Sequence, residues 1–156
     1  MIELKQVSLA RGGVSVLHDV SLNIPAGAIT VVVGRSGVGK STLIGSLNGL
    51  FRPSCGDITV NGIGPLRHDR AWQAHRRQTA TVFQEHALID RLSALDNVLL
   101  PLEIVEPHRS QFKQKRKQYE ARAIELLGKV GLAGYERKFP WQLSGGMQQR
   151  ASICRA

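Results

Sequence analysis

Apolar and polar positions alternate along the first part of the chain. Val20, Leu22 and Ile24 are each separated by one polar residue, and the start of the chain shows a similar mixture. Because successive side chains of a strand point to opposite faces of a sheet, this pattern predicts strands over residues 2–9 and 14–24.

A different pattern follows at residues 29–33, which are almost all apolar and β-branched. Such a run is typical of a central strand that is buried on both faces. Residues 41–50 then predict a helix with Leu43, Ile44 and Leu47 on one face.

Two shorter strands are predicted further along. Ile58 and Val60 alternate with polar residues before Asn61 and Gly62, a pair that favours a tight turn. The apolar and β-branched residues at 79–83 predict another strand.

The second half of the chain has helical periodicity. Apolar residues recur at spacings of three, four and seven, which places them on one face of a helix over about residues 110–130. These residues are Phe112, Tyr119, Ala123, Leu126 and Val130. A further helix is predicted to begin after Ser144, a residue suited to cap it.

Composition narrows the possible classes. The 156 residues include 21 Lys and Arg against 12 Asp and Glu, a formal net charge of +9, and 42% are hydrophobic. The chain can therefore form a buried core, and its charge suggests an anionic partner. No apolar run reaches the roughly 18 residues of a membrane span, and Cys55 and Cys154 are expected to be buried, reduced thiols.

Glycines gather directly after the apolar run, in a segment that fits G-x-x-x-x-G-K-[ST]. Glycines allow successive backbone N–H groups to point at a phosphate, and the following helix adds the positive end of its dipole. The lysine supplies a charge for the β- and γ-phosphates, and the serine hydroxyl can bind Mg²⁺. The predicted nucleotide-phosphate site consists of Gly34, Arg35, Ser36, Gly37, Val38, Gly39, Lys40, Ser41 and Thr42.

A second glycine pair stands at the start of the last predicted helix. Ser144 caps this helix start, and Gly145 and Gly146 leave its N–H groups exposed, so a second anion can bind there. A single P-loop needs no second anion-binding site to hold its phosphates. Two copies related by a twofold axis can therefore each complete the other's site.

These motifs, in this order, resemble those of the ATP-binding cassette (ABC) ATPases, the motor subunits of ABC transporters. Residues 34–42 resemble the Walker A motif, residues 81–85 the Q-loop and residues 143–150 the signature motif. The resemblance covers essentially the whole chain. It implies an α/β fold of the P-loop NTPase class: a RecA-like core with an antiparallel β-subdomain and a helical subdomain, incomplete at the C-terminus.

The resemblance also implies how the chain is organised. Residues 1–156 would form a partial ABC ATP-binding domain, with the β-subdomain and P-loop core in residues 1–84. The helical subdomain with the signature motif would lie in residues 85–150. Gln84 would be the catalytic glutamine that senses Mg²⁺ and water, so Ser41 and Gln84 are the expected Mg²⁺ ligands. The residues expected to contact ATP held by a second copy are Ser144, Gly145, Gly146 and Gln148.

In function, the resemblance implies an ATP-binding subunit that uses MgATP to power solute transport, with a bacterial importer favoured. Expected partners are transmembrane permease subunits, a second ATP-binding subunit in a head-to-tail dimer and, for an importer, indirectly a solute-binding protein. The expected location is the cytoplasmic face of the inner membrane. The signature and Q-loop segments are similar to those of nitrate/sulfonate- or phosphonate-type importers. Residues 96–102 are similar to the lipoprotein-release and cell-division branch, so the branch and the transported substrate stay open.

The chain departs from the family pattern in two places. Many members have an aromatic residue that stacks on adenine where this chain has Arg11, which can stack through its guanidinium plane. The sequence also ends before the Walker B aspartate, the catalytic glutamate and the switch histidine. We therefore expect the front portion of a longer ABC ATPase, in which ATP is held but hardly hydrolysed. Residues 29–33 would then be without their neighbouring strands and would expose apolar side chains.

Two other functions and one local alternative stay open. The basic residues from Arg109 to Arg122 would fit an ABC-type ATPase that acts with nucleic acid. No nucleic-acid partner is expected, however, because no nucleic-acid motif accompanies these residues and a solvated helix face explains them better. A non-catalytic remnant is the other alternative, so enzymatic activity is left undecided. Residues 85–97 suit either a groove for a partner helix or a loop with core-facing leucines.

Overall fold

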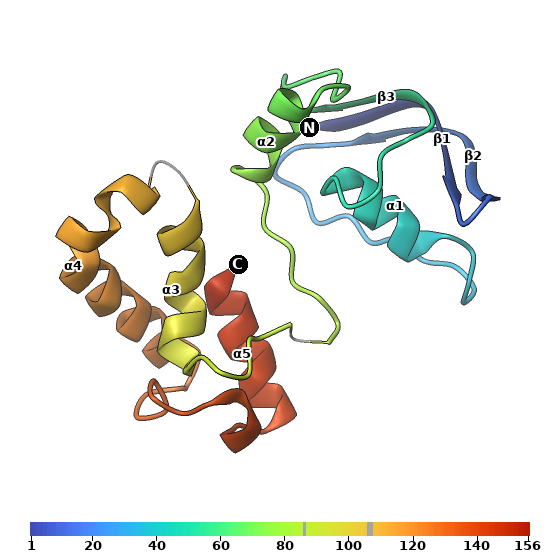
Figure 1. Cartoon of the computed structure of the whole chain (residues 1–156). Helices are drawn as coiled ribbons and strands as arrows, with labels where there is room; N and C mark the ends of the chain where they lie inside the picture. Colours follow the sequence, from blue (N-terminus) through green and yellow to red (C-terminus); the bar gives the residue numbers. More distant parts are fainter. Residues whose placement is uncertain (86, 106–107) are drawn as a thin grey trace. The chain divides into compact units, whose positions relative to one another are not determined.

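The computed structural model describes residues 1–85, 87–105 and 108–156, which form two compact units, Met1–Ala80 and Thr81–Ala156 (Figure 1). Each unit has a hydrophobic core of its own. The subdomain division after Gln84 stays a prediction.

The first unit is built on a three-stranded antiparallel sheet in the order β2-β1-β3. Strand β1 spans Ile2–Arg11, β2 spans Val14–Ile24 and β3 spans Cys55–Val60. The strands predicted from alternation in this region are therefore confirmed, and Asn61 and Gly62 form the predicted tight turn, with a backbone hydrogen bond from Ile63 N to Val60 O of 2.7 Å.

Two short helices cover the core of this unit. Helix α1 spans Lys40–Leu47, which confirms the predicted helix with an earlier end, and α2 spans Asp69–Arg76. No sequence pattern predicts α2. Its buried Trp72 joins the core, and its buried His75 places Nε2 2.5 Å from the Leu47 carbonyl oxygen. The hydrogen bond to Leu47 fixes α2 against the end of α1.

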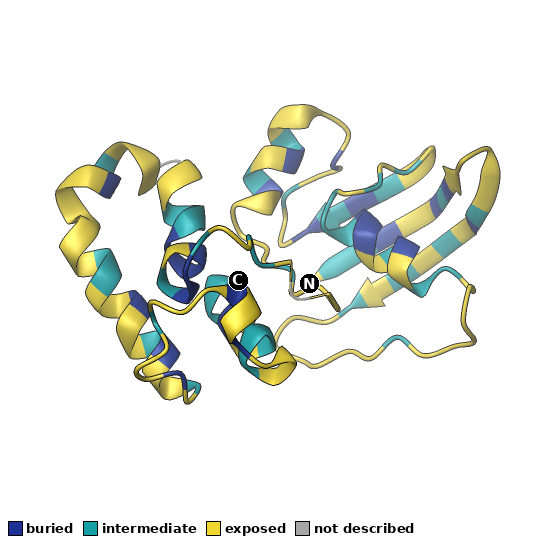
Figure 2. Ribbon diagram, turned by 60° about the horizontal axis from the view of Figure 1, so that its bottom comes forward, coloured by how far each residue is buried: buried dark blue, intermediate teal, exposed yellow. Residues whose placement is uncertain are grey.

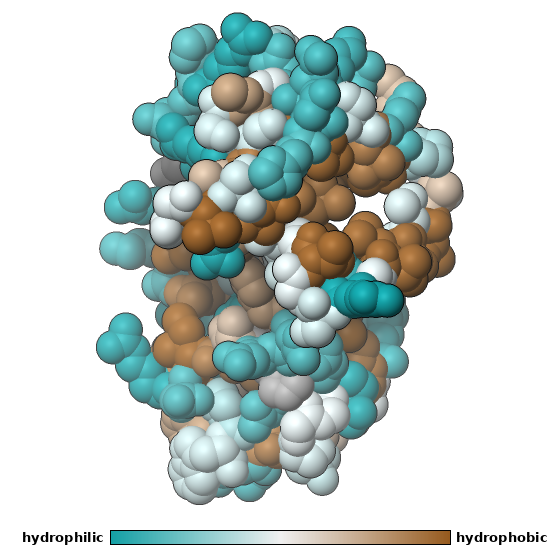
Figure 3. All heavy atoms as spheres, turned by 90° about the vertical axis from the view of Figure 1, so that its right-hand side faces the viewer, coloured by the Kyte–Doolittle hydropathy of each residue, from teal (hydrophilic) through white to brown (hydrophobic). Residues whose placement is uncertain are grey.

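The strands predicted over residues 29–33 and 79–83 are absent, so both predictions are wrong for this structure. Ile29, Val31 and Val33 are 96%, 73% and 83% exposed, which matches the expectation of exposed apolar side chains. Among the described residues no strand pairs with either segment, and an extended run without a partner forms no ladder hydrogen bonds. Apolar side chains are visible at the surface in Figure 3.

The second unit is helical. Helix α3 spans Ala94–Ile104, α4 spans His108–Lys129 and α5 spans Gly145–Arg155, with a 3₁₀ turn at Pro140–Gln142. The predicted long helix and the predicted helix after Ser144 are both confirmed. Figure 2 shows buried positions on the inner sides of these helices and exposed positions outside. The core residues are Val98, Leu99, Phe112, Ala123, Leu127, Leu132 and Ala151.

Asn97 organises the loop that leads into α3. Its side chain is fully buried; Oδ1 accepts from the Ile89 N–H at 2.8 Å, and Nδ2 donates to the carbonyls of Ile89 at 3.1 Å and Ser93 at 3.0 Å. Leu88 packs against the helical core. Part of the segment 85–97 thus faces the core; His86, within it, lies outside the described residues.

Two further predictions from the sequence concern the cysteines and membrane-spanning segments. Cys55 is exposed, so the expectation of a buried thiol is wrong there, because its end of β3 lies at the sheet margin opposite Ser8. Cys154 is half-buried, and burial raises the pKa of its thiol. None of the described helices combines the length and the apolar character that crossing a bilayer requires.

Candidate nucleotide-binding site

The glycine-rich loop of residues 34–39 leads directly into α1. Gly39 has φ +102°, in the left-handed region that favours glycine. A Cβ atom at this position would lie 3.1 Å from Val16 Cγ1 and 3.3 Å from Leu17 Cδ2. The end of the loop is therefore packed closely against β2, and only glycine combines this backbone with this contact.

The start of α1 leaves its backbone donors available. The first bond of the helix ladder runs from Leu43 N to Gly39 O at 2.8 Å, so the N–H groups of Lys40, Ser41 and Thr42 precede it. Gly39 offers no side chain to cap them, and within the described chain the first turn carries no acidic residue. The positive end of the helix dipole is therefore free to attract an anion.

Lys40 folds its side chain back over the loop. Its Nζ donates to the Gly34 carbonyl oxygen at 2.9 Å and to the Arg35 carbonyl oxygen at 2.8 Å. An ammonium group held by neutral carbonyls can exchange them for phosphate oxygens, which bind it more strongly because they are charged. Residues 34–42 thus bring together a glycine loop, a cation and an uncapped helix start, the combination that fits a phosphate chain.

The hydroxyl groups beside Lys40 have different environments. Ser41 is exposed in the first turn of α1, whereas Thr42 is buried. A hydroxyl oxygen of this kind is a suitable ligand for Mg²⁺, which prefers oxygen donors and keeps several waters. Gln84 is exposed in the second unit, and the structure does not place the two units relative to one another.

The signature residues form a second, differently built helix start. The Ser144 hydroxyl accepts from the Met147 N–H at 3.4 Å and so caps α5 as predicted. Gln148 Nε2 donates to the carbonyl oxygens of Pro140 at 2.8 Å and Leu143 at 3.2 Å. Its side chain therefore fixes the preceding turn to the helix, a local role that the sequence did not suggest. The role of these residues towards a second copy stays a prediction.

Arg11 contacts an aromatic ring. Its guanidinium carbon lies 4.2 Å from the centroid of the Phe51 ring, a cation–π distance. Phe51 lies far away in the sequence and carries no motif, so only the fold reveals it as part of this region.

A family model described as "ABC transporter" matches residues 17–156. The chain belongs to this family. Its match includes the glycine loop, Gln84 and the signature segment, so the resemblance seen in the motifs extends over nearly all of this ABC chain.

Known relatives of the ABC chain include proteins named as importer subunits. It is 44% identical over 156 residues to the phosphonates import ATP-binding protein PhnC 2 of Rhodopseudomonas palustris, covering 100% of this chain and 55% of that protein. It is 41% identical over 162 residues to the methionine import ATP-binding protein MetN 1 of Paraburkholderia xenovorans, covering 100% of this chain and 45% of that protein. The chain thus spans about half the length of these relatives.

Solved structures support the same fold. The dimeric ATP-binding cassette MJ0796, in a post-hydrolysis state bound to ADP and phosphate, matches with a TM-score of 0.81 and 32% identity. The match covers 99% of this chain and 68% of that one. The described residues therefore adopt part of the P-loop NTPase fold of ABC cassettes, with the antiparallel sheet and the helical unit as expected.

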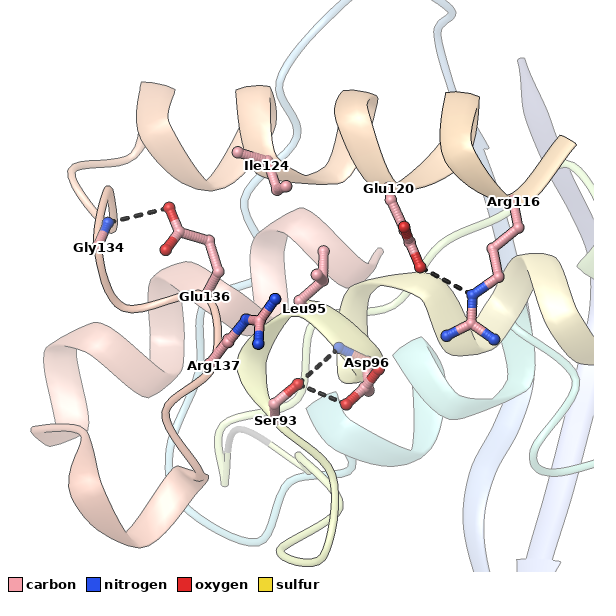
Figure 4. A pocket seen from close by; sticks show the side chains of 9 residues that line it. All are labelled: Ser93, Leu95, Asp96, Arg116, Glu120, Ile124, Gly134, Glu136 and Arg137. Atoms are coloured by element: carbon pink, nitrogen blue, oxygen red, sulfur yellow. Dashed lines mark hydrogen bonds and ion pairs between the residues drawn. The ribbon is translucent and has the colours of Figure 1, made fainter.

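A hollow of about 610 Å³ lies in the helical unit of the ABC chain (Figure 4). Both of its glutamates have hydrogen-bond partners: Arg116 Nε donates to Glu120 at 2.7 Å, and the Gly134 N–H donates to Glu136 at 2.9 Å. With acidic and basic groups both present, it has no strong preference for an anion. The lining residues are Ser93, Leu95, Asp96, Arg116, Glu120, Ile124, Gly134, Glu136 and Arg137.

The basic run on α4 is partly neutralised within the helix. Glu125 binds Arg122 at 2.7 Å and Lys129 at 2.6 Å, and the hydrogen bonds from Lys129 and Arg122 lower the pKa of its carboxyl to about 2. Arg116 is paired with Glu120 in the same way. These pairs favour a solvated helix face over a nucleic-acid surface.

Proposed function

We propose that the chain binds ATP through residues 34–42, as the nucleotide-binding part of an ABC transporter subunit. The arrangement of Lys40 carries this proposal: its ammonium is held over a glycine loop by exchangeable carbonyls, beside an uncapped helix start. This places a positive charge and free N–H donors on one small surface, as a β- or γ-phosphate requires.

Magnesium belongs to the same proposal. Ser41 offers a hydroxyl oxygen next to Lys40, and Gln84 is the second ligand suggested by the family resemblance. Bound Mg²⁺ would neutralise charge on the β- and γ-phosphates. The protein's own contribution is to hold the phosphate chain and to present these oxygen donors.

Binding, rather than hydrolysis, is the activity proposed for these 156 residues. Efficient hydrolysis requires both a group that orients the attacking water and a group that takes up its proton. Gln84 carries an amide, which can orient water but cannot take up a proton at neutral pH. Gln84 is therefore assigned a sensing role, and turnover is expected to be slow.

The whole protein is proposed to serve a bacterial importer. The names of the two relatives support this, since one is named a phosphonates import ATP-binding protein and the other a methionine import ATP-binding protein. The partners would be permease subunits, a second ATP-binding subunit arranged head to tail and, indirectly, a solute-binding protein. The place of action would be the cytoplasmic face of the inner membrane. In such a dimer, Ser144, Gly145, Gly146 and Gln148 would face ATP bound to the other copy.

Nucleotide binding can be tested by titrating the chain with a fluorescent ATP analogue in the presence of Mg²⁺. The Lys40→Ala variant is expected to bind about a hundredfold more weakly, because it removes a charge-assisted contact to the phosphates. Lys5→Ala is the matched control, since Lys5 is an exposed lysine of the same unit whose partner is Glu3 at 3.2 Å. Equal affinity of the wild-type chain and Lys40→Ala would refute the proposal.

A further inference from the structure

Arg11 stands at the end of β1, paired with Val14 across the hairpin. Its guanidinium carbon lies 4.2 Å from the centroid of the Phe51 ring. Phe51 is half-buried, whereas Arg11 is exposed. The guanidinium group thus has a ring on one side, and the exposed Arg11 side chain stays accessible to a ligand.

Phe51 is itself fixed to α1. Its N–H donates to the Gly45 carbonyl oxygen at 3.1 Å, and a Cβ atom on Gly45 would lie 2.5 Å from ring atoms Cδ2 and Cε2. The absence of a side chain at Gly45 therefore makes room for the ring. Because α1 begins at the phosphate loop, Phe51 links the position of Arg11 to the helix that carries Lys40.

The hairpin end also lies within reach of the glycine loop. Gly39 packs on Val16 and Leu17, which are two and three residues from Val14 along β2. A strand advances about 3.3 Å per residue, so the hairpin end is about 7–10 Å from this contact. A nucleotide held by its phosphates at the start of α1 must project its base out of the loop, and the hairpin end offers a surface for it.

We propose that Phe51 is a positioning residue that holds the Arg11 guanidinium as a flat platform for the base of the bound nucleotide. The inference rests on the proposed nucleotide function. An arginine side chain without a neighbour samples many rotamers, whereas one stacked on a ring is already oriented. Stacking reads the face of a base rather than its edges, so adenine and guanine should be accepted alike.

The test compares ligands with and without a base. The full chain is titrated with ATP, GTP and inorganic triphosphate, each with Mg²⁺. Arg11→Ala is expected to weaken ATP and GTP binding by about tenfold and to leave triphosphate binding unchanged. Phe51→Leu is expected to weaken both nucleotides by about threefold, because it removes only the orienting ring, and Phe51→Tyr should bind as the wild-type chain does.

The Arg11→Lys variant distinguishes the effect of the flat guanidinium group from the effect of its positive charge. It keeps the positive charge without the flat guanidinium, so it should weaken ATP binding as Arg11→Ala does. This variant also decides the question if Phe51→Leu disturbs the packing on Gly45, since Arg11 is exposed and its replacement leaves the core intact.

Each other outcome has a distinct meaning. If Arg11→Ala weakens triphosphate as much as ATP, Arg11 acts as a charge on the phosphates and the platform is refuted. An unchanged ratio of ATP to triphosphate affinity in every variant would refute the platform while leaving the nucleotide site in place. If neither ligand binds the wild-type chain, the proposed function itself has failed.

Discussion

The starts of α1 and α5 resemble each other in sequence, since each is rich in glycine and neither has an acidic side chain in the first turn of the described helix. They differ in how their backbone donors are satisfied. Ser144 caps α5 with its hydroxyl, whereas Gly39 in front of α1 has no side chain to offer. A capped start is stable by itself, while an uncapped start gains most from a ligand. Of these two helix starts, the α5 start is stabilised by its own side-chain cap, whereas the α1 start gains more from a bound anion.

The largest change in stability is expected from Gly39→Ala. An alanine there would have to adopt φ +102° and would bring its Cβ within 3.1 Å of Val16, so the free energy of unfolding should fall by about 2 kcal/mol. ATP affinity should fall by more than tenfold because the loop is displaced. Urea denaturation and an ATP titration measure the two effects.

Gly128→Ala is the matched control for this replacement. Gly128 lies within α4 with no atom near the position of a Cβ, so alanine should raise stability by about 0.5–1 kcal/mol through its better helix propensity. If Gly39→Ala is as stable as the wild-type chain and binds ATP equally well, the loop is not held as described.

A smaller effect is expected at the capped start. Ser144→Ala removes the hydroxyl that accepts from Met147 N–H and should lower the free energy of unfolding by about 1 kcal/mol without any ligand. Ser144→Asp, which retains an acceptor, should restore most of this stability. Equal denaturation midpoints for Ser144→Ala and the wild-type chain would show that α5 does not depend on its cap.

The smallest change in stability is expected at Ser41, in the first turn of the uncapped start. Ser41→Ala should alter the free energy of unfolding by less than about 0.5 kcal/mol, because its exposed hydroxyl caps nothing. Its effect should be confined to ATP binding in the presence of Mg²⁺ and vanish when the metal is chelated. A loss of affinity that is the same with and without Mg²⁺ would remove Ser41 from the metal site.

The features foreseen from the sequence are those encoded within a few neighbouring residues. The helix after the glycine loop and the cap at Ser144 follow from local patterns, as does the long amphipathic helix α4. The contact of Arg11 with Phe51 could not be foreseen, because it joins segments that meet only once β1 and α1 have packed. Helix α2 was not predicted because it too depends on a contact between separate segments. Its amphipathic face is short, and Trp72 packs against Gly49.

Residues 29–33 show the opposite situation. The run is apolar and β-branched, as strands often are, but it forms no strand because a strand needs a partner to pair with. This segment has no proline and no charge, and it carries the most exposed isoleucine of the chain at Ile29. Such a stretch has the composition that self-assembling peptides use to form intermolecular ladders. In concentrated solution it is the part of this chain that would be the first to nucleate aggregation, and a single lysine at Val31 is the change that would best protect the protein during handling.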